Sequence, residues 1–572
     1  FTRDRKTGQI IEEKQGEYTV NRTYDSEGNC TRITSSLGAD IRHTYDREGN
    51  LQTMQAGESW QASWVRDNTG LEVQRTFSGG VTVRTERDCF GREVHKSVRS
   101  RGMEKGAYRY QWGIANRLLS KENELTGTVT RYDYDRFDFL IRQETIQGSE
   151  TDVIYRVPDF VGNLFETPDK KDRKYGAGGK LLEDPDCFYL YDDEGNLIFR
   201  EFKQLQETGV RFDRKRMEKE RGIRCLATGT GWLYEWSSNG MLKKVIRPDG
   251  RSVEFRYDAL GRRTAKQYFG KVTRWVWDGN VPIHEWNYKV TDMQSDEKES
   301  TPLKEPTKDI TTWVFEADTF VPTAKIQDGK QYSIVSDYLG TPIQMYDEEG
   351  NKTWDCTLNA YGKTTTFEGR FLNECPFRYQ GQYEDRETGL YYNRFRYYDS
   401  SNGNYISQDP IRLRGGLNIY NYVHDSNLWI DIFGLNRRGK QTTIDHIEEV
   451  KECFLKDNPK YTHIGGGKDI SGKQLPEIYI RSSNPVPKST KGGSYADLTF
   501  ESPDGQIVHI NTVDRGNYNN SGMSRREYVN ANRIQADAPD SIVITVRKGD
   551  TVSAGDLDIQ KQNMKKGKIH NH

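Results

Sequence analysis

The chain lacks several features that often identify a protein class. Its seven cysteines are scattered, with no CxxC pair and no Cys/His cluster, which argues against a disulfide framework and a zinc site. No apolar run reaches membrane-spanning length, and no signal peptide is recognisable. Only 34% of the residues are hydrophobic, too few for several leucine-rich helical cores. Burial must therefore depend on another group of side chains.

That group is aromatic. The 572 residues include 33 Tyr, 22 Phe and 11 Trp beside 53 Gly, a composition that favours strands bounded by turns and predicts a mainly β protein. The length suggests three to four domains. The net charge of −1 argues against a whole-chain polyanion binder, but residues 436–572 carry 21 Lys+Arg against 17 Asp+Glu, and residues 1–435 carry 63 against 68. The basic C-terminal part is either a solvated end or a nucleic-acid contact.

A short turn motif recurs along the first two thirds of the chain. YDSEGN and YDREGN begin at Tyr24 and Tyr45, 21 residues apart. Related copies begin at Tyr191, Tyr257 and Tyr346. In each copy Asp can start a turn through its side chain, and Gly can supply the positive φ before the next strand. The period predicts β-hairpins stacked edge to edge over residues 1–375. A charged insert at 290–309 is expected to be a surface loop.

The repeat gives way to a Tyr-rich segment, residues 377–435, which contains NRFRYYD, SQDPIRL and the final IDIFGL. This segment resembles the end of the core of Rhs (YD-repeat) proteins, the shell-forming part of polymorphic toxins. The resemblance implies that residues 1–375 curl into a hollow β-shell, or cocoon, and that residues 376–435 form a self-cleavage plug. It also implies a cut between Leu435 and Asn436 that releases an enclosed toxin. From periodicity alone, an open β-solenoid or a propeller is the alternative.

Two carboxylates and one cation stand out in the plug: Asp409, Asp431 and Arg396. Two Asp side chains in a partly dry pocket share a proton, so one can activate water while the other polarises a carbonyl. By the Rhs resemblance, this aspartic-protease chemistry cuts the chain itself, and Arg396 holds the pair. The plain alternative is two ordinary Asp turns. Rhs proteins usually have DPIGL where this chain has DPIRL, so Arg412 replaces a glycine. They usually have DPxGL where this chain has DIFGL, so Ile432 replaces a proline. We therefore expect slower cleavage.

Residues 436–572 follow the order α-β-β-α-β and predict a small α+β domain. The predicted elements are a helix at 443–457, a loop at 463–477, a hairpin at 494–514, a helix at 524–536 and a strand at 541–549. With Asp497 on the first hairpin strand, this order resembles the core of PD-(D/E)XK nucleases. The resemblance implies a divalent metal, Mg²⁺ by preference, with oxygen ligands.

The metal-ligand candidates in this domain are Asp497, Asn511, Asp514, Glu448 and Glu449. Glu527 is a further catalytic candidate. The family has a lysine two residues after its second ligand, and this sequence does not, so His509 or Arg515 is the candidate replacement. Each acidic residue could instead be an ordinary strand end or part of a solvated helix face.

The Rhs resemblance therefore implies an antibacterial toxin whose tip we expect to be a metal-dependent DNase with nucleic acid as its substrate. The partners it implies are a cognate immunity protein and a secretion-spike (VgrG/PAAR-like) protein, or an N-terminal part of the same polypeptide that plays that role. It further implies secretion by a type VI machine and delivery into the cytoplasm of a competing cell. A ribonuclease or nucleotide-modifying toxin in the same shell is one alternative, and a non-enzymatic adhesion or scaffold protein of the teneurin type is another.

Overall fold

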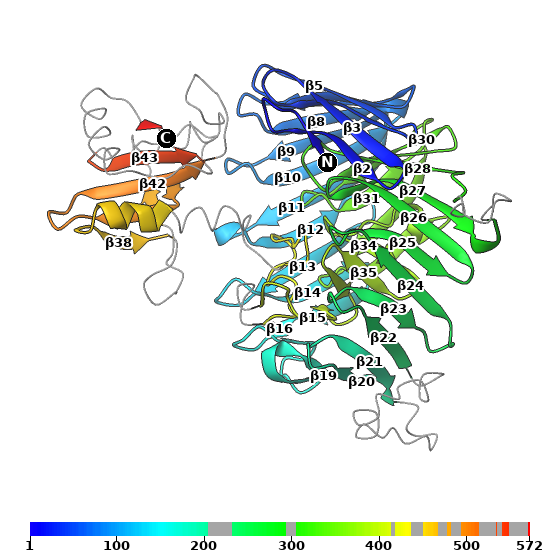
Figure 1. The fold of residues 1–572 in the computed structure, drawn as a ribbon. Coiled ribbons are helices and arrows are strands. Elements are labelled where there is room, and N and C mark those ends of the chain that lie inside the picture. Colours follow the sequence, from blue (N-terminus) through cyan, green and yellow to red (C-terminus); the bar gives the residue numbers. More distant parts are fainter. Residues whose placement is uncertain are drawn as a thin grey trace. The chain divides into compact units, whose positions relative to one another are not determined.

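The computed structural model describes residues 1–203, 231–292, 305–412, 418–435, 450–466, 478–481, 493–513, 534, 540–547 and 570–571. The chain forms two compact units. The first comprises Phe1–Glu86 and Glu93–Asn436, and the second comprises Arg87–Arg92 and Arg437–His572. Figure 1 shows the first unit as a continuous succession of β-hairpins, and the predicted mainly β fold is confirmed. No described helix is long and apolar enough to cross a membrane.

The first unit contains two large antiparallel sheets, each with its strands in chain order. The 15 strands of the first sheet are β1 (Thr2–Arg3), β2 (Ile10–Gln15), β3 (Tyr18–Tyr24), β4 (Cys30–Ser35), β5 (Asp40–Tyr45), β6 (Leu51–Ala56), β7 (Trp60–Arg66), β8 (Glu72–Phe77), β9 (Val81–Arg87), β10 (Glu93–Ser100), β11 (Met103–Trp112), β12 (Leu118–Asn123), β13 (Thr128–Tyr134), β14 (Leu140–Gln147) and β15 (Glu150–Tyr155). A short pair, β16 (Val157–Pro158) and β17 (Leu164–Phe165), leads to the second sheet.

The second sheet has 16 strands. They are β18 (Lys174–Tyr175), β19 (Leu181–Glu183), β20 (Cys187–Tyr191), β21 (Leu197–Phe202), β22 (Gly231–Trp236), β23 (Leu242–Ile246), β24 (Ser252–Tyr257), β25 (Arg263–Tyr268), β26 (Lys271–Asp278), β27 (Val281–Lys289), β28 (Thr311–Phe315), β29 (Pro322–Gln327), β30 (Lys330–Ser336), β31 (Pro342–Tyr346), β32 (Lys352–Leu358) and β33 (Thr364–Gly369). Short 3₁₀ turns lie at Ser78–Gly80, Ile114–Asn116, Ala177–Gly179, Val290–Asp292 and Leu372–Glu374. Most of the charged insert predicted as a surface loop lies outside the described residues.

The YD turn explains why each strand ends where it does. In the first copy, Asp25 accepts backbone N–H bonds from Glu27 (3.1 Å) and Asn29 (2.8 Å) through one carboxylate oxygen. Gly28 has φ +92°, a conformation that favours glycine. The Tyr24 hydroxyl donates to the carbonyl of Ile10 on a preceding strand, 2.9 Å away. The Asp therefore caps the turn while the Tyr ties it to its neighbour.

The two sheets run alongside each other in the same direction. Side chains of the first sheet contact partners in the second that lie 241 to 273 residues later. The contacts are Ser35–His284 (2.6 Å), Trp60–Ser333 (3.0 Å), Arg75–Glu316 (3.0 Å) and Ser100–Gly350 (2.6 Å). Because the separation stays near 250 residues, one circuit of the β strip takes about 250 residues, and the second circuit begins within the second sheet. A shared apolar core with members from both sheets joins the circuits.

A third, four-stranded sheet follows the second circuit. Its strands are β34 (Tyr383–Asp385), β35 (Leu390–Asn393), β36 (Arg396–Asp399) and β37 (Asn404–Tyr405). Every residue of β35, β36 and β37 is buried. A cluster of stacked tyrosines, including Tyr379, Tyr398, Tyr405 and Tyr422, forms the core of this segment. The described residues of 376–435, the segment that we call the plug, therefore form a largely buried core of their own.

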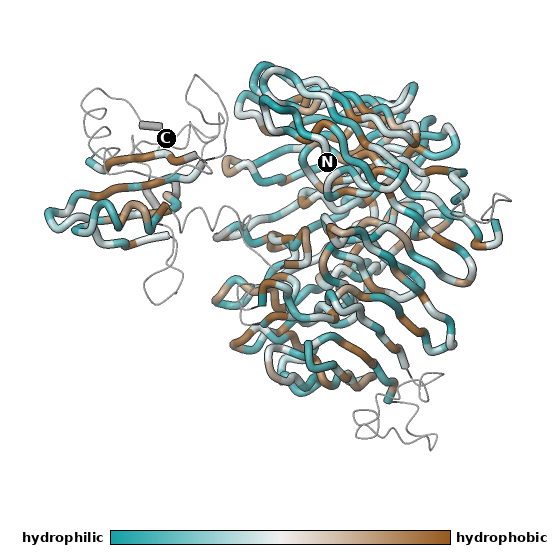
Figure 2. The backbone as a smooth tube through the Cα atoms, in the orientation of Figure 1, coloured by the Kyte–Doolittle hydropathy of each residue, from teal (hydrophilic) through white to brown (hydrophobic). Residues whose placement is uncertain are grey.

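The second unit contains a five-stranded sheet in the order β38 (Thr462–Gly465), β41 (Leu498–Glu501), β42 (Ile507–Val513), β43 (Ile542–Arg547) and β44 (His570–Asn571). A separate pair consists of β39 (Ile478–Arg481) and β40 (Gly493–Ala496). A helix at 450–457 packs Val450 and Phe454 on the sheet. Figure 2 shows hydrophobic stretches along β42 and β43, whereas the strands of the first unit alternate in hydropathy.

The structure corrects two expectations for this unit. The start of the predicted loop at 463–477 is strand β38, which pairs with β41, because His463 and Ile464 continue a short alternating strand. Asp497 lies in a bend between β40 and β41 rather than within a hairpin strand. The β41–β42 hairpin itself forms as expected, and β43 adds to it in parallel. The first half of the predicted helix 443–457 and most of the predicted helix 524–536 lie outside the described residues.

Candidate functional site

The plug brings three predicted residues together around one guanidinium group. Nη2 of Arg396, at the start of β36, lies 3.3 Å from Oδ2 of Asp409 and 3.2 Å from Oδ2 of Asp431. The three residues are 1%, 1% and 4% exposed. One guanidinium thus lies between two carboxylates in a dry interior, where little water screens their charges.

Arg396 also holds the backbone beside the predicted cut. Its Nε donates to the carbonyl of Gly434, and its Nη1 donates to the carbonyl of Ile419, 3.1 Å away. The planar fork of a guanidinium is suited to several fixed acceptors at once, and a lysine ammonium is not. Arg396 therefore connects the carboxylate pair to the residue that precedes Leu435.

The segment Asp431–Leu435 shares two features with the YD turn, an Asp that caps the N–H four residues on and a glycine in the fourth position. Oδ1 of Asp431 accepts the backbone N–H of Leu435 at 2.9 Å, four residues on. Gly434, in the fourth position, has φ +66°, and a Cβ there would lie 2.5 Å from the carbonyl oxygen of Asn393. Close packing and a positive φ thus both require glycine. The turn places the Leu435 backbone directly against the carboxylate pair.

Asp409 begins a second turn of this type. Its Oδ1 accepts the N–H of Ile411 at 2.9 Å, and its carbonyl accepts the N–H of Arg412 at 2.8 Å. Arg412 has φ +53° in the position where Rhs boxes usually carry glycine. A non-glycine residue bears a steric cost there of about 1–2 kcal/mol, which gives the expected slower cleavage a structural basis.

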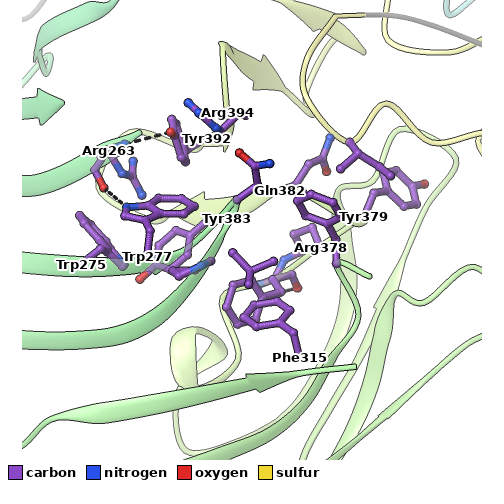
Figure 3. Close-up of a pocket in the computed structure, with 17 residues that line it drawn as sticks. Arg263, Trp275, Trp277, Phe315, Arg378, Tyr379, Gln382, Tyr383, Tyr392 and Arg394 are labelled. Atoms are coloured by element: carbon purple, nitrogen blue, oxygen red, sulfur yellow. Dashed lines mark hydrogen bonds between the residues drawn. The ribbon is translucent and has the colours of Figure 1, made fainter. Parts of the chain in front are cut away.

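A small cavity lies beside Ile432, in the segment Asp431–Leu435. It has a volume of about 30 Å³, is lined by aromatic rings, and includes Gln382, Arg394 and Ile432 among its walls. Figure 3 shows Gln382 and Arg394 beside Trp277 and Tyr392. This is room for a water molecule and not for a drug-sized ligand.

Glycine also shapes the wall of this cavity. A Cβ on Gly381, which has φ +86°, would lie 2.1 Å from the carbonyl oxygen of Ile432. Only a residue without a Cβ at position 381 therefore allows the segment Asp431–Leu435 to pack this closely. The backbone of the turn is fixed from this side by Gly381 and from the other side by Asn393 and Arg396.

Two residues of the site were missed by sequence analysis. The Tyr405 hydroxyl donates to Oδ2 of Asp431 at 2.8 Å, and its ring lies 3.6 Å from the guanidinium carbon of Arg396. Asn393 donates through Nδ2 to the Asp431 carbonyl at 2.8 Å. Burial, with the Asp431 charge second, holds the pKa of Tyr405 well above its usual range. A single sequence gives no signal for either, because both belong to motifs dense in Tyr and Asn.

In the second unit, Asp497 and Asn511 meet at the sheet. Oδ2 of Asp497 accepts from the backbone N–H (2.6 Å) and hydroxyl (2.9 Å) of Thr512, and Oδ1 of Asn511 accepts the Asp497 N–H at 3.3 Å. His509 is bonded to Thr499 at 3.1 Å, and burial lowers its pKa to about 4. His509 is therefore a neutral imidazole near pH 7.

The remaining predicted residues of this unit, Glu448, Glu449, Asp514 and Glu527, lie outside the described residues, as does Asn436. Within the described part of the chain, no three His, Cys, Asp or Glu side chains are grouped as metal ligands. Asp497 and Asn511 offer two adjacent oxygen donors of the type that Mg²⁺ prefers. The donor types fit such an ion, and the metal site stays a prediction.

Two large antiparallel sheets of YD hairpins and a buried Tyr-rich segment define a YD-repeat shell protein. Residues 72–426 match the family model described as Teneurin YD-shell. The chain belongs to this family, and the predicted Rhs-type resemblance is confirmed.

Three curated relatives are similar over most of this chain. Double-stranded DNA deaminase toxin A of Burkholderia cenocepacia is 28% identical over 455 residues, 75% of this chain and 30% of its own length. Probable deoxyribonuclease RhsA of Dickeya dadantii is 27% identical, covering 73% and 27%. Toxin protein Tse5 of Pseudomonas aeruginosa is 26% identical, covering 71% and 35%. The chain therefore spans about a third of each relative's length.

Solved structures show the same fold. A Tc holotoxin pore of Photorhabdus luminescens has a TM-score of 0.50 at 18% identity, over 74% of this chain and 21% of its own. The crystal structure of TcdB2–TccC3 has a TM-score of 0.50 at 17% identity, over 73% of this chain and 22% of its own. At this identity the likeness concerns the fold alone.

Proposed function

We propose that the plug is an aspartic protease that cuts its own chain between Leu435 and Asn436. One observation carries this proposal: a single guanidinium contacts Asp409, Asp431 and the carbonyl of Gly434, and Asp431 binds the N–H of Leu435. One cation thus holds both carboxylates beside the backbone that leads into the proposed cut. Such preorganised geometry is what an intramolecular hydrolysis requires.

The reaction class is water-dependent peptide hydrolysis. One carboxylate accepts a proton from water while the other, protonated, donates to the carbonyl oxygen of Leu435. Burial of the plug excludes bulk water and strengthens these interactions. The products are a Leu435 carboxyl group and an Asn436 amine.

Gel electrophoresis and mass spectrometry of the purified chain test this proposal. Cleavage gives two species, the smaller corresponding to residues 436–572, whereas an uncut chain gives one species of 66.2 kDa. N-terminal sequencing of the smaller species should begin at Asn436. A single uncut species from correctly folded protein would refute the proposal and would favour the adhesion or scaffold alternative.

We further propose that residues 436–572 are the toxin and act on nucleic acid. The support is that similar proteins are named a deoxyribonuclease and a DNA deaminase toxin, and that this domain is the basic part of the chain. The proposal is also supported by the contact between Asp497 and Asn511, two oxygen-bearing side chains, and by the neutral His509 on the same strand as Asn511. A bound Mg²⁺ would supply an activated water, with Asp497 and Asn511 as its oxygen ligands.

The nuclease proposal is tested with the released domain, plasmid DNA and total RNA, each with and without Mg²⁺. Loss of DNA cleavage in Asp497→Ala, with retained folding by circular dichroism, is the expected result. Degradation of RNA alone would move the assignment to the ribonuclease alternative, and an unchanged Asp497→Ala variant would refute the site. An immunity protein, a secretion spike and delivery into a target cell complete the proposal by analogy with the toxins that the chain resembles.

A further inference from the structure

Asp431 is contacted by more than the charged groups of the pair. Its Oδ2 accepts from the Tyr405 hydroxyl and from Arg396, and its Oδ1 accepts from Leu435 N–H. A hydroxyl that donates to a carboxylate stabilises the ionised form of that carboxylate, because only this form leaves both oxygens free to accept.

The direction of the Tyr405 hydrogen bond is fixed by Asn393. Nδ2 of Asn393 lies 2.8 Å from the Asp431 carbonyl oxygen, which can only accept, so this atom is the amide nitrogen. The same Nδ2 lies 2.7 Å from the Tyr405 oxygen. That oxygen accepts from Asn393, and its own proton must point to Asp431. The arrangement is a one-way chain of donors.

Among the described residues, the titratable and charged groups that contact Asp431 are Arg396, Tyr405 and Tyr422, and Asp409 is joined to it through Arg396. The Tyr422 oxygen accepts the Asp431 N–H at 3.3 Å. We propose that Tyr405, oriented by Asn393, is a positioning residue that keeps Asp431 the ionised member of the pair, so that Asp409 carries the shared proton. This inference rests on the proposed self-cleavage and adds what it left open, the role of each carboxylate.

The roles then follow for each step of the reaction. Asp431 takes a proton from water as the water oxygen bonds to the Leu435 carbonyl carbon, and Asp409 gives its proton to the carbonyl oxygen. In the collapse, the C–N bond breaks, the Asn436 nitrogen takes the proton from Asp431, and Asp409 regains one from the new hydroxyl. One water is consumed, and both carboxyl groups return to their starting states.

The test is the pH profile of cleavage. Newly synthesised chain is taken into guanidinium before it can fold and cut itself, and this uncut precursor is refolded by dilution into buffers from about pH 4 to pH 8. Band conversion gives the rate, and tryptophan fluorescence reports folding. Loss of a donor makes Asp431 harder to keep ionised, so in Tyr405→Phe the acidic limb should move to higher pH by about one to two units, the size expected for one hydrogen bond to a charged group. Asn393→Ala should move the limb in the same direction, and the double variant should add little.

Tyr398→Phe is the matched control. Tyr398 belongs to the same buried cluster, and its hydroxyl donates to the Tyr361 carbonyl at 2.7 Å. It should leave the acidic limb in place. Replacement of Tyr405 by 3-fluorotyrosine, a stronger donor of nearly the same size, should move the limb to lower pH and provides the test if the Phe variant does not refold.

An acidic limb that stays fixed in the folded Tyr405 and Asn393 variants, or that moves equally in Tyr398→Phe, overturns the inference while self-cleavage stands. A folded wild-type chain that gives no cleavage at any pH overturns the proposed self-cleavage itself. The two failures are therefore distinct.

Discussion

The turn Asp25–Asn29 lies in the large β-sheets of the first unit, which we call the wall, and the segment Asp431–Leu435 lies in the plug. The two share an Asp cap and a glycine position but differ in their surroundings. Each begins with an Asp whose carboxylate accepts an N–H four residues on, at 2.8 Å and 2.9 Å, and each has a positive-φ glycine in the fourth position. In the wall the tip faces solvent, and Asp25 is engaged by its own Asn29. In the plug the Asp is buried beside Arg396 and Asp409.

A repeated turn can therefore supply the backbone of the proposed cleavage site without a new backbone motif. Although burial opposes it, hydrogen bonds from Asn29 and neighbouring N–H groups lower the pKa of Asp25, so this residue is a simple charged cap. In the plug, a second carboxylate and a shared guanidinium are added around an otherwise ordinary turn. The chemistry comes from the surroundings.

The largest expected effect comes from an Asp→Asn substitution, which should nearly stop cleavage when made in the plug but not when made in the wall. Asp431→Asn and Asp409→Asn each keep a side chain that can cap a turn but cannot exchange a proton, so the cleavage rate should fall by about a thousandfold. Asp46→Asn, the same change in a wall turn, should cleave at the wild-type rate. Time-resolved gels of refolding precursors measure all three. Normal cleavage in Asp431→Asn would show that the plug turn is only structural.

The second effect concerns the shared glycine. Gly434→Ala introduces a Cβ that meets the Asn393 carbonyl oxygen at 2.5 Å, so the turn must shift and cleavage should slow by about a hundredfold. In Gly49→Ala the nearest atom is 3.8 Å away and the backbone is equally left-handed, at φ +79°. This control should lose only a little stability in thermal melts and no cleavage. Equal cleavage rates for the two variants would contradict the claim that close packing of Gly434 against Asn393 positions the turn for cleavage.

A third, smaller effect tests the fork of Arg396. Arg396→Lys retains the charge but cannot contact both carboxylates and two carbonyls at once, so cleavage should slow by about tenfold, the value of one lost charge-assisted hydrogen bond. Arg92→Lys, in a wall turn where Arg92 pairs with Asp88, serves as the control. A wild-type rate in Arg396→Lys would mean that charge alone is sufficient.

The last effect is on stability and not on cleavage rate, and it has opposite signs in the two regions. Burial raises the pKa of Asp425, a plug residue, to about 6, so the folded state binds more protons than the unfolded state between about pH 4 and pH 6. The plug should therefore lose up to about 3 kcal/mol of stability as the pH rises through this window. Wall turns such as Asp25–Asn29, with a lowered pKa, should instead weaken as the pH falls below about 4.

Hydrogen exchange of peptides from 418–430 and 18–35, at pH 4.5 and pH 6.5, measures this difference. In Asp425→Asn the pH dependence of the plug peptides should disappear, while the wall peptides stay as in the wild type. A plug that is equally protected at both pH values in the wild-type chain would contradict the prediction.

The sequence predicted what depends on local chemistry. The Asp and Gly of each YD turn determine backbone geometry within five residues, and the hairpins, the mainly β class and the β41–β42 hairpin follow from them. The Rhs-like motifs of residues 377–435 placed Asp409, Asp431 and Arg396 in one segment. Strand β38 was missed because its few residues contain glycine and lie in a stretch that otherwise indicates a loop.

Contacts between distant parts of the chain could not be predicted. The bond between Ser35 and His284 joins residues 249 apart, and nothing near either one indicates the other. Tyr405 and Asn393 were missed for a related reason: only the folded plug shows which of its many Tyr and Asn side chains reach Asp431. Enclosure of residues 436–572 by the shell stays a prediction.

The contacts that join hairpins about 250 residues apart restrict how such a protein can evolve. A duplicated 21-residue unit inserted between Ser35 and His284 would put every later hairpin out of step with its neighbour in the previous circuit. Repeat copies in the overlapping part of the wall can therefore diverge in sequence far more readily than they can change in number. Single-hairpin insertions should be tolerated only where one circuit has no second circuit beside it.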